Sequence, residues 1–203
     1  MINTKRLRCM LGWLGMMLAF IVLALSEAYG YGFPDSISAT YYIPTCITPF
    51  MIILGSAGLL LISYKGYELI DDIVCTLAGI FGLGICIFSC SGQPGLVGTF
   101  QLPSDISGII HNSCATCFFG LLSINSLFLF TKTNGLITPN KKKRNTIFRV
   151  CGIGMIASFA GMIPVKIFNI HGGCWFVEMI ALLFFGISWL TKANCYRWLF
   201  ADE

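Results

Sequence analysis

The two histidines of this sequence each stand three residues before a cysteine. They are His111 and His171, and the cysteines are Cys114 and Cys174. Side chains three residues apart on a helix point the same way, one turn apart. Two imidazole nitrogens and two thiolates suit tetrahedral zinc. We therefore consider these four residues as the ligands of a metal site that takes a zinc-like ion as its cofactor.

Glu178 is an ionisable residue inside a long apolar segment. A charged side chain at such a depth costs roughly 2.5–3.5 kcal/mol on insertion scales unless it faces a polar partner or a wet cavity. We expect Glu178, His111 and Ser38 to form a polar site that performs general acid–base catalysis or orients a ligand. Glu27 and His171 are expected at the same end of the protein. In the alternative interpretation, these polar groups merely satisfy one another.

A Cys-x-x-Cys pair, Cys114 and Cys117, begins another apolar segment. A helix N-terminus favours the thiolate, so this pair is a candidate for thiol–disulfide exchange. The motif resembles that of the vitamin K epoxide reductase and quinone-linked disulfide-forming membrane proteins, which hold such a pair at the exoplasmic end of a helix. The alternative is that both thiols only fill space in the packing. The expected exchange partners are Cys46, Cys86, Cys90 and Cys174.

Composition places these residues in a membrane protein. Of the 203 residues, 56% are apolar and 11% charged, whereas soluble domains average about 45–50% apolar and about 25% charged. This excludes an ordinary soluble enzyme. At roughly 20 residues per crossing, the apolar runs predict an all-α, polytopic six-helix bundle forming a single domain over residues 1–203. The predicted spans are about 9–29, 46–64, 70–90, 107–130, 148–165 and 173–190.

Lysine and arginine positions predict the orientation of the bundle. They gather before the first span, after the second, fourth and sixth spans, and scarcely occur in the other connections. By the positive-inside rule, both termini are cytoplasmic and the histidines exoplasmic. Residues 191–203 mix basic and aromatic side chains, which is typical of an interfacial cytoplasmic tail. The basic residues form no aromatic-interleaved patch, so we expect no nucleic-acid partner.

Membrane lipids are the partners that this composition predicts. The run Lys141–Arg144 either recruits anionic lipid or serves only as a stop-transfer signal. Glycines at helical spacing, such as Gly58 and Gly79, predict close helix packing and allow a homo-oligomer. The segments Ile110–Cys114 and Ile170–Cys174 are similar, so an internal repeat is a further hypothesis.

Motifs along most of the chain carry a resemblance to a known group. They are Ser36–Tyr42, Tyr64–Tyr67, His111 with Phe118 and Phe119, and Glu178 with Phe185–Leu190. Together they resemble bacterial six-helix membrane proteins of unknown function, related in pattern to the Frag/DRAM/Sfk type. The resemblance implies one helix bundle with a polar exoplasmic site, in the bacterial cytoplasmic membrane, and it implies no reaction.

Three functional hypotheses follow. In the first, the protein is a membrane-embedded enzyme or metal protein that binds or processes a lipid headgroup, a quinone or a metal at the polar site. In the second, it is a non-catalytic membrane sensor or assembly subunit. In the third, it is a thiol–disulfide oxidoreductase that uses Cys114 and Cys117.

Overall fold

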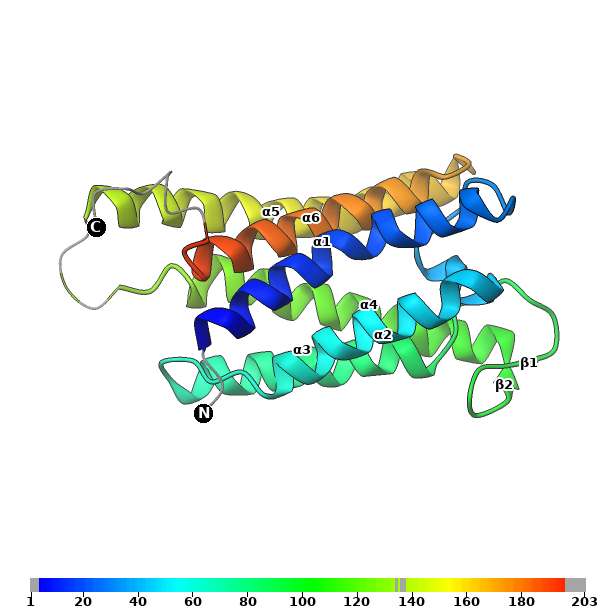
Figure 1. Cartoon of the computed structure of the whole chain (residues 1–203), viewed down its shortest axis with the longest axis horizontal. Coiled ribbons are helices and arrows are strands. Elements are labelled where there is room, and N and C mark those ends of the chain that lie inside the picture. Colours follow the sequence, from blue (N-terminus) through cyan, green and yellow to red (C-terminus); the bar gives the residue numbers. More distant parts are fainter. Residues whose placement is uncertain (1–3, 134, 136–137, 196–203) are drawn as a thin grey trace.

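The computed structural model describes residues 4–133, 135 and 138–195, and these are mainly helical (Figure 1). Within them, six helices are long and apolar enough to cross a membrane, in agreement with the six predicted spans. The fold is therefore an all-helical bundle of membrane-protein type. The helices are α1 (Thr4–Ala28), α2 (Pro44–Ile62), α3 (Leu69–Ile87), α4 (Ser104–Ile124), α5 (Pro139–Ile167) and α6 (Gly173–Lys192).

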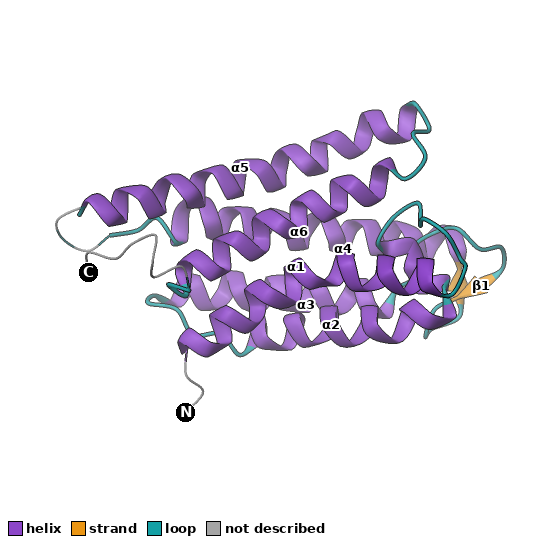
Figure 2. Ribbon diagram, turned by 45° about the horizontal axis from the view of Figure 1, so that its top comes forward, coloured by secondary structure: helices purple, strands orange, loops and turns teal. Residues whose placement is uncertain are grey.

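The six helices form a closed ring in sequence order (Figures 1 and 2). Each packs against its neighbours along the chain, and α6 also packs against α1. Aromatic side chains fill much of the interior, where the Trp189 ring meets the Phe130 and Tyr64 rings edge to face, with centroids 5.1 Å away. Such edge-to-face geometry is the favoured one for aromatic pairs.

The two ends of the bundle differ in structure (Figure 1). We call one the hairpin end, because it carries a small antiparallel pair of strands, β1 (Leu96–Val97) and β2 (Leu102–Pro103). A short 3-10 helix, η1 (Ser38–Tyr42), and the turn between α5 and α6 lie at this end too. The other is the terminal end, where α1 begins and α6 ends. The apolar pattern predicted neither η1 nor the strands, because both lie in polar connections.

Helix α5 begins earlier than predicted, at Pro139 rather than near residue 148. Thr138 explains this, because its Oγ1 accepts a hydrogen bond from the Lys141 backbone N–H at 3.2 Å and so caps the first turn. At 1.5 Å per residue, 29 residues span about 44 Å, more than a hydrocarbon core of about 30 Å. The run Lys141–Arg144 can therefore lie beyond that core.

Helix α4 continues as a π-helical turn, η2 (Asn125–Leu129). Together they cover most of the predicted span 107–130. The predicted interfacial tail falls mainly outside the described residues. Of residues 191–203, Thr191 and Lys192 extend α6, and residues 196–203 are not described.

Glycines bring two pairs of helices into backbone contact. A Cβ placed on Gly79 of α3 would lie 2.5 Å from the Gly58 carbonyl oxygen of α2. A Cβ on Gly186 of α6 would lie 2.7 Å from the Gly12 carbonyl oxygen of α1. Only small residues permit such approach, and in lipid it lets helices gain van der Waals contact. These glycines pack within one chain, and a homo-oligomer stays a prediction.

We predict that Gly79→Ala and Gly186→Ala each lower the free energy of unfolding by about 1–3 kcal/mol, because each added methyl group would press on backbone that must move. Gly120→Ala is the matched control. A Cβ at Gly120 of α4 meets nothing within 4 Å, and alanine is the better helix former by about 1 kcal/mol. Unfolding in mixed micelles, followed by tryptophan fluorescence, measures all three. Equal stability of the three variants would contradict the close crossings.

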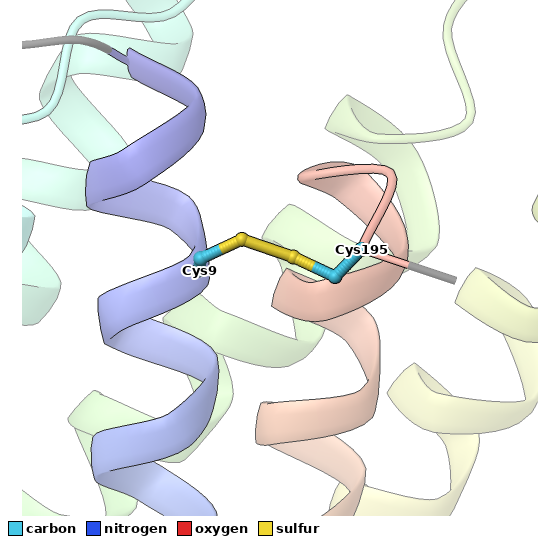
Figure 3. The surroundings of a disulfide bond; sticks show 2 residues. All are labelled: Cys9 and Cys195. Atoms are coloured by element: carbon cyan, nitrogen blue, oxygen red, sulfur yellow. A yellow bond between two sulfur atoms is a disulfide. The ribbon is translucent and has the colours of Figure 1, made fainter. Parts of the chain in front are cut away.

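A disulfide joins Cys9 of α1 to Cys195, just beyond α6 (Figure 3). It links positions 186 residues apart and so ties the first helix to the last at the terminal end. The remaining eight cysteines are free. Disulfides persist in oxidising compartments, whereas the lysines and arginines predict a cytoplasmic terminal end. Exposure of this end to reducing cytosol would leave the two cysteines as thiols.

We predict that oxidised, purified protein, unfolded and alkylated without reductant, takes up eight labels, and that it takes up ten after reduction. The same count on protein from acid-quenched intact cells, unfolded and alkylated without reductant, then reports the surroundings of the terminal end, since ten labels indicate a reducing compartment and eight an oxidising one. Peptide mass spectrometry identifies the protected pair. Alkylation of Cys9 and Cys195 in the oxidised protein would show that this disulfide does not form.

Candidate functional site

Three of the predicted site residues meet at the hairpin end in a chain of hydrogen bonds. The Nε2 atom of His111 lies 3.1 Å from the Ser38 Oγ. The Ser38 hydroxyl in turn lies 3.2 Å from the Glu178 Oε1. The three residues come from α4, η1 and α6. The structure thus brings together Ser38, His111 and Glu178, which are far apart in the sequence.

His111 is held rigidly by the end of α3. Its ring is 1% exposed, and Nδ1 lies 2.7 Å from the backbone carbonyl oxygen of Phe88, the residue that follows α3. The last carbonyls of a helix have no partner within that helix, so this one is available. A carbonyl can only accept, so Nδ1 must carry a proton. The tautomer is thereby fixed, and Nε2 faces Ser38.

Ser38 is held by Glu178 through the backbone as well as through the hydroxyl. The Ile37 N–H donates to the Glu178 Oε2 at 2.5 Å, and the Ser38 N–H donates to the same oxygen at 3.3 Å. These amides stand at the start of η1, where no helical acceptor precedes them. Glu178 therefore caps η1 from another helix and locks Ser38 against α6.

The segment before η1 is anchored to α6 as well. The Trp175 backbone N–H donates to the Asp35 carbonyl oxygen at 3.0 Å. The Phe33 ring packs on the Trp175 and Phe176 rings, with centroids 5.0 Å and 5.6 Å away. Gly172 makes room beneath it, because it has a φ of +68° and a Cβ there would lie 2.8 Å from the Phe33 ring. The position of Ser38 therefore does not depend on Glu178 alone.

The distances in the hydrogen-bond chain allow a proton to lie on either of two residues. Its two links, His111 Nε2 to Ser38 Oγ and Ser38 Oγ to Glu178 Oε1, need two hydrogens. The Ser38 hydroxyl supplies one. The second resides either on His111, beside a Glu178 carboxylate, or on a neutral Glu178, beside a neutral imidazole. In both states one residue flanking Ser38 can give a proton and the other can take one.

A lateral cavity of about 360 Å³ lies next to this chain and includes Ser38, His111 and Glu178 in its wall. It falls within the 300–1,000 Å³ that small-molecule sites occupy. Thr116 of α4 and Ile163 of α5 are exposed at its edge, so it opens between these helices. The rest of the wall is mainly apolar and comprises Leu18, Ile37, Phe50, Leu54, Ile85, Ala115, Phe118, Phe119, Phe159, Met162 and Leu182.

A second hollow, the end cleft, has about 540 Å³ and lies among the connections of the hairpin end. Its lining is more polar and includes Asp35, Ser36, Tyr42 and Gln93. The lateral cavity and the end cleft adjoin, because they share five lining residues: Ser38, Asn112, Met162, Lys166 and Glu178. A polar cleft and an apolar cavity therefore lie side by side where the hydrogen-bond chain lies.

Lys166 supplies positive charge at that junction. It stands in the last turn of α5 and is exposed. Within the part of the chain that the structure describes, its ammonium group makes no hydrogen bond or ion pair. In the sequence, Lys166 is marked only as the single lysine or arginine between the predicted spans 148–165 and 173–190. Glu27 is exposed and lines neither hollow.

The four predicted metal ligands do not converge. His171 Nδ1 pairs with Asp35 Oδ1 at 2.7 Å, and both side chains are exposed, whereas His111 is buried. His171 lies in the turn before α6, so the helical-spacing argument does not apply to it and Cys174. Cys114 packs against Gly84 of α3. The described ranges contain no group of three or more His, Cys, Asp or Glu side chains placed to hold a metal ion.

The proposed redox pair consists of free thiols. Cys114 is partly buried and Cys117 is exposed on α4. Cys90, an expected partner, donates through Sγ to the Ser38 carbonyl oxygen at 3.3 Å. Burial, reinforced by the nearby Glu178, raises the pKa of the Cys90 thiol to about 12, so it is a poor source of thiolate. Thiol exchange stays a prediction to which the geometry adds no support.

A third cavity, of about 320 Å³, lies at the terminal end. Its cations are held by groups of the protein itself. Lys132 pairs with Glu68 at 2.6 Å, and the Lys141 Nζ donates to the Phe130 carbonyl oxygen at 3.0 Å. The Lys192 ammonium lies 4.8 Å from the Phe130 ring centroid. Recruitment of anionic lipid by the run Lys141–Arg144 stays a prediction.

Comparisons with known proteins give no relative: no family model, no curated protein and no solved structure matches the chain. The resemblance to the Frag/DRAM/Sfk type therefore stays a prediction.

Proposed function

We propose that this protein binds a membrane amphiphile that has an acidic headgroup. The hydrocarbon chain lies in the lateral cavity, and the headgroup lies in the end cleft beside Lys166. The observation that carries this proposal is the junction of an apolar and a polar hollow at five shared residues. An amphiphile has the same division into an apolar and a polar part.

The position of the opening supports a ligand that comes from the bilayer. The lateral cavity opens between α4 and α5, where Thr116 and Ile163 line it and are exposed. Both helices are apolar enough to span a membrane, so this opening faces acyl chains. A lipid can then move sideways from the acyl region of the membrane into the cavity. Its chain is never exposed to water on this route, and the hydrophobic effect would oppose such exposure.

Charge at the junction favours an acidic headgroup. Lys166 has no acidic partner among the described residues. A phosphate or carboxylate headgroup would supply the ion pair that the Lys166 ammonium lacks.

The test compares phosphatidylglycerol with phosphatidylcholine of the same acyl chains, added to protein purified in neutral detergent. Native mass spectrometry measures the lipid retained. We expect preferential retention of phosphatidylglycerol. Lys166→Gln should weaken that preference about fivefold, which corresponds to an ion pair of about 1 kcal/mol. Lys143→Gln is the matched control, because Lys143 is exposed on the first turns of α5, away from this junction.

A second variant tests the apolar half of the site. Ala115 is partly buried and lines the lateral cavity, so Ala115→Phe should fill part of it and reduce retention of both lipids. Equal retention of the two lipids by the native protein, unchanged by Lys166→Gln and Ala115→Phe, would contradict the proposal.

A further inference from the structure

We propose that Ser38 is a nucleophile that cleaves a carboxylic ester of the bound amphiphile, with His111 and Glu178 transferring the protons. This inference rests on the proposed function, because an ester bond reaches Ser38 only when an acyl chain occupies the lateral cavity. It goes further by assigning a reaction class, acyl transfer to water, and a role to each of the three side chains.

The arrangement around Ser38 meets the geometric requirements for an activated nucleophile. A hydroxyl attacks well only when a base within hydrogen-bond reach can take its proton and that base is itself oriented by a third group. His111 Nε2 lies 3.1 Å from the Ser38 Oγ. The Phe88 carbonyl oxygen, 2.7 Å from Nδ1, orients the ring and fixes the tautomer. Ser38 also lines both hollows, so its hydroxyl is accessible from either.

The shared proton provides an acid as well as a base. In the reactive arrangement, Glu178 carries the second proton and His111 is neutral, so the Ser38 hydroxyl donates to His111 Nε2. Ester cleavage needs both functions, since the nucleophile must lose a proton and the leaving alcohol must gain one. Glu178 is positioned for the second function because it lines the cavity and lies 3.2 Å from the Ser38 Oγ.

In the first half of the reaction, the Ser38 Oγ forms a bond to the ester carbonyl carbon and its proton passes to His111 Nε2. The bond from that carbon to the alcohol oxygen breaks, and the Glu178 proton passes to the leaving oxygen. The products are an acyl-serine, a free alcohol, an imidazolium and a carboxylate. No electrons are gained or lost, and the number of protons is unchanged.

In the second half, a water molecule from the end cleft attacks the acyl carbon and gives its proton to the Glu178 carboxylate. The bond from the acyl carbon to the Ser38 Oγ breaks, and His111 returns a proton to that oxygen. A fatty acid leaves, and the three residues regain their starting state. Asn112 and Lys166 line the same junction and supply donors for the oxyanion that forms in each half.

The first experiment uses a fluorophosphonate that carries a long alkyl chain, added to the full-length protein in phosphatidylglycerol nanodiscs. We expect a covalent adduct, and peptide mass spectrometry should place it on Ser38. Ser38→Ala should abolish it. Ser113→Ala should not, because Ser113 is exposed on α4 and donates only to the Ile109 carbonyl oxygen. Should Ser38→Ala fail to fold, the near-isosteric Ser38→Cys takes its place and should likewise form no fluorophosphonate adduct.

The second experiment measures fatty acid released from the same nanodiscs. His111→Asn keeps an amide donor near the Phe88 carbonyl but removes the base, so we expect the release rate to fall by about 10²–10⁴-fold. Glu178→Gln keeps an oxygen acceptor for the Ile37 and Ser38 amides but cannot carry the proton. It should slow release while the amount of retained lipid stays the same.

The outcomes separate this inference from the function on which it rests. Retained phosphatidylglycerol with neither an adduct on Ser38 nor released fatty acid would overturn the esterase assignment and leave lipid binding in place. An adduct on another residue, unaffected by Ser38→Ala, would overturn it too. Failure of the native protein to retain lipid would instead contradict the proposed function itself.

Discussion

The interaction on which the hairpin end depends is that of the Glu178 carboxylate with the amides of Ile37 and Ser38. A carboxylate within an apolar helix is costly unless its oxygens are satisfied, and here two backbone N–H groups and one hydroxyl satisfy them. The same contact caps η1, which has no acceptor of its own for these amides. This interaction therefore satisfies both the Glu178 carboxylate and the amides at the start of η1. It also places Ser38 beside the buried His111.

The bundle leaves a cavity beside this chain because its helices do not all approach equally closely. Glycine contacts bring α2 against α3 and α1 against α6. The lateral cavity opens between α4 and α5. Bulky side chains such as Phe118 and Phe119 line the cavity without closing it. Close crossings elsewhere in the ring thus coexist with a cavity that opens between these two helices.

The local sequence pattern predicted the helices and part of the site. What it did not predict depends on contacts between residues far apart in the chain. Apolar runs longer than the hydrocarbon core predicted all six spans, and the cost of an ionisable group in lipid singled out Glu178. His171 was misjudged as a counterpart of His111, because spacing in the sequence does not tell that a turn precedes Gly173. The contact of His111 with the Phe88 carbonyl and the disulfide between Cys9 and Cys195 depend on which helix ends lie close together in space. The pattern of side chains along the sequence does not predict this.

Lys166 differs from the other described lysines and arginines in its position along the bundle. Most lysines and arginines of this chain belong to the terminal end, as the positive-inside rule predicts for a cytoplasmic side. Among the lysines and arginines that the structure describes, Lys166 is the exception, a cation at the opposite end. The dipole at the end of α5 favours a positive charge there, but this would hold for any position in the last turn. Lys166 occupies the position that borders both hollows. An acidic group held at that junction would sit between the ammonium and the Ser38 hydroxyl, which is where an ester next to a headgroup would have to lie.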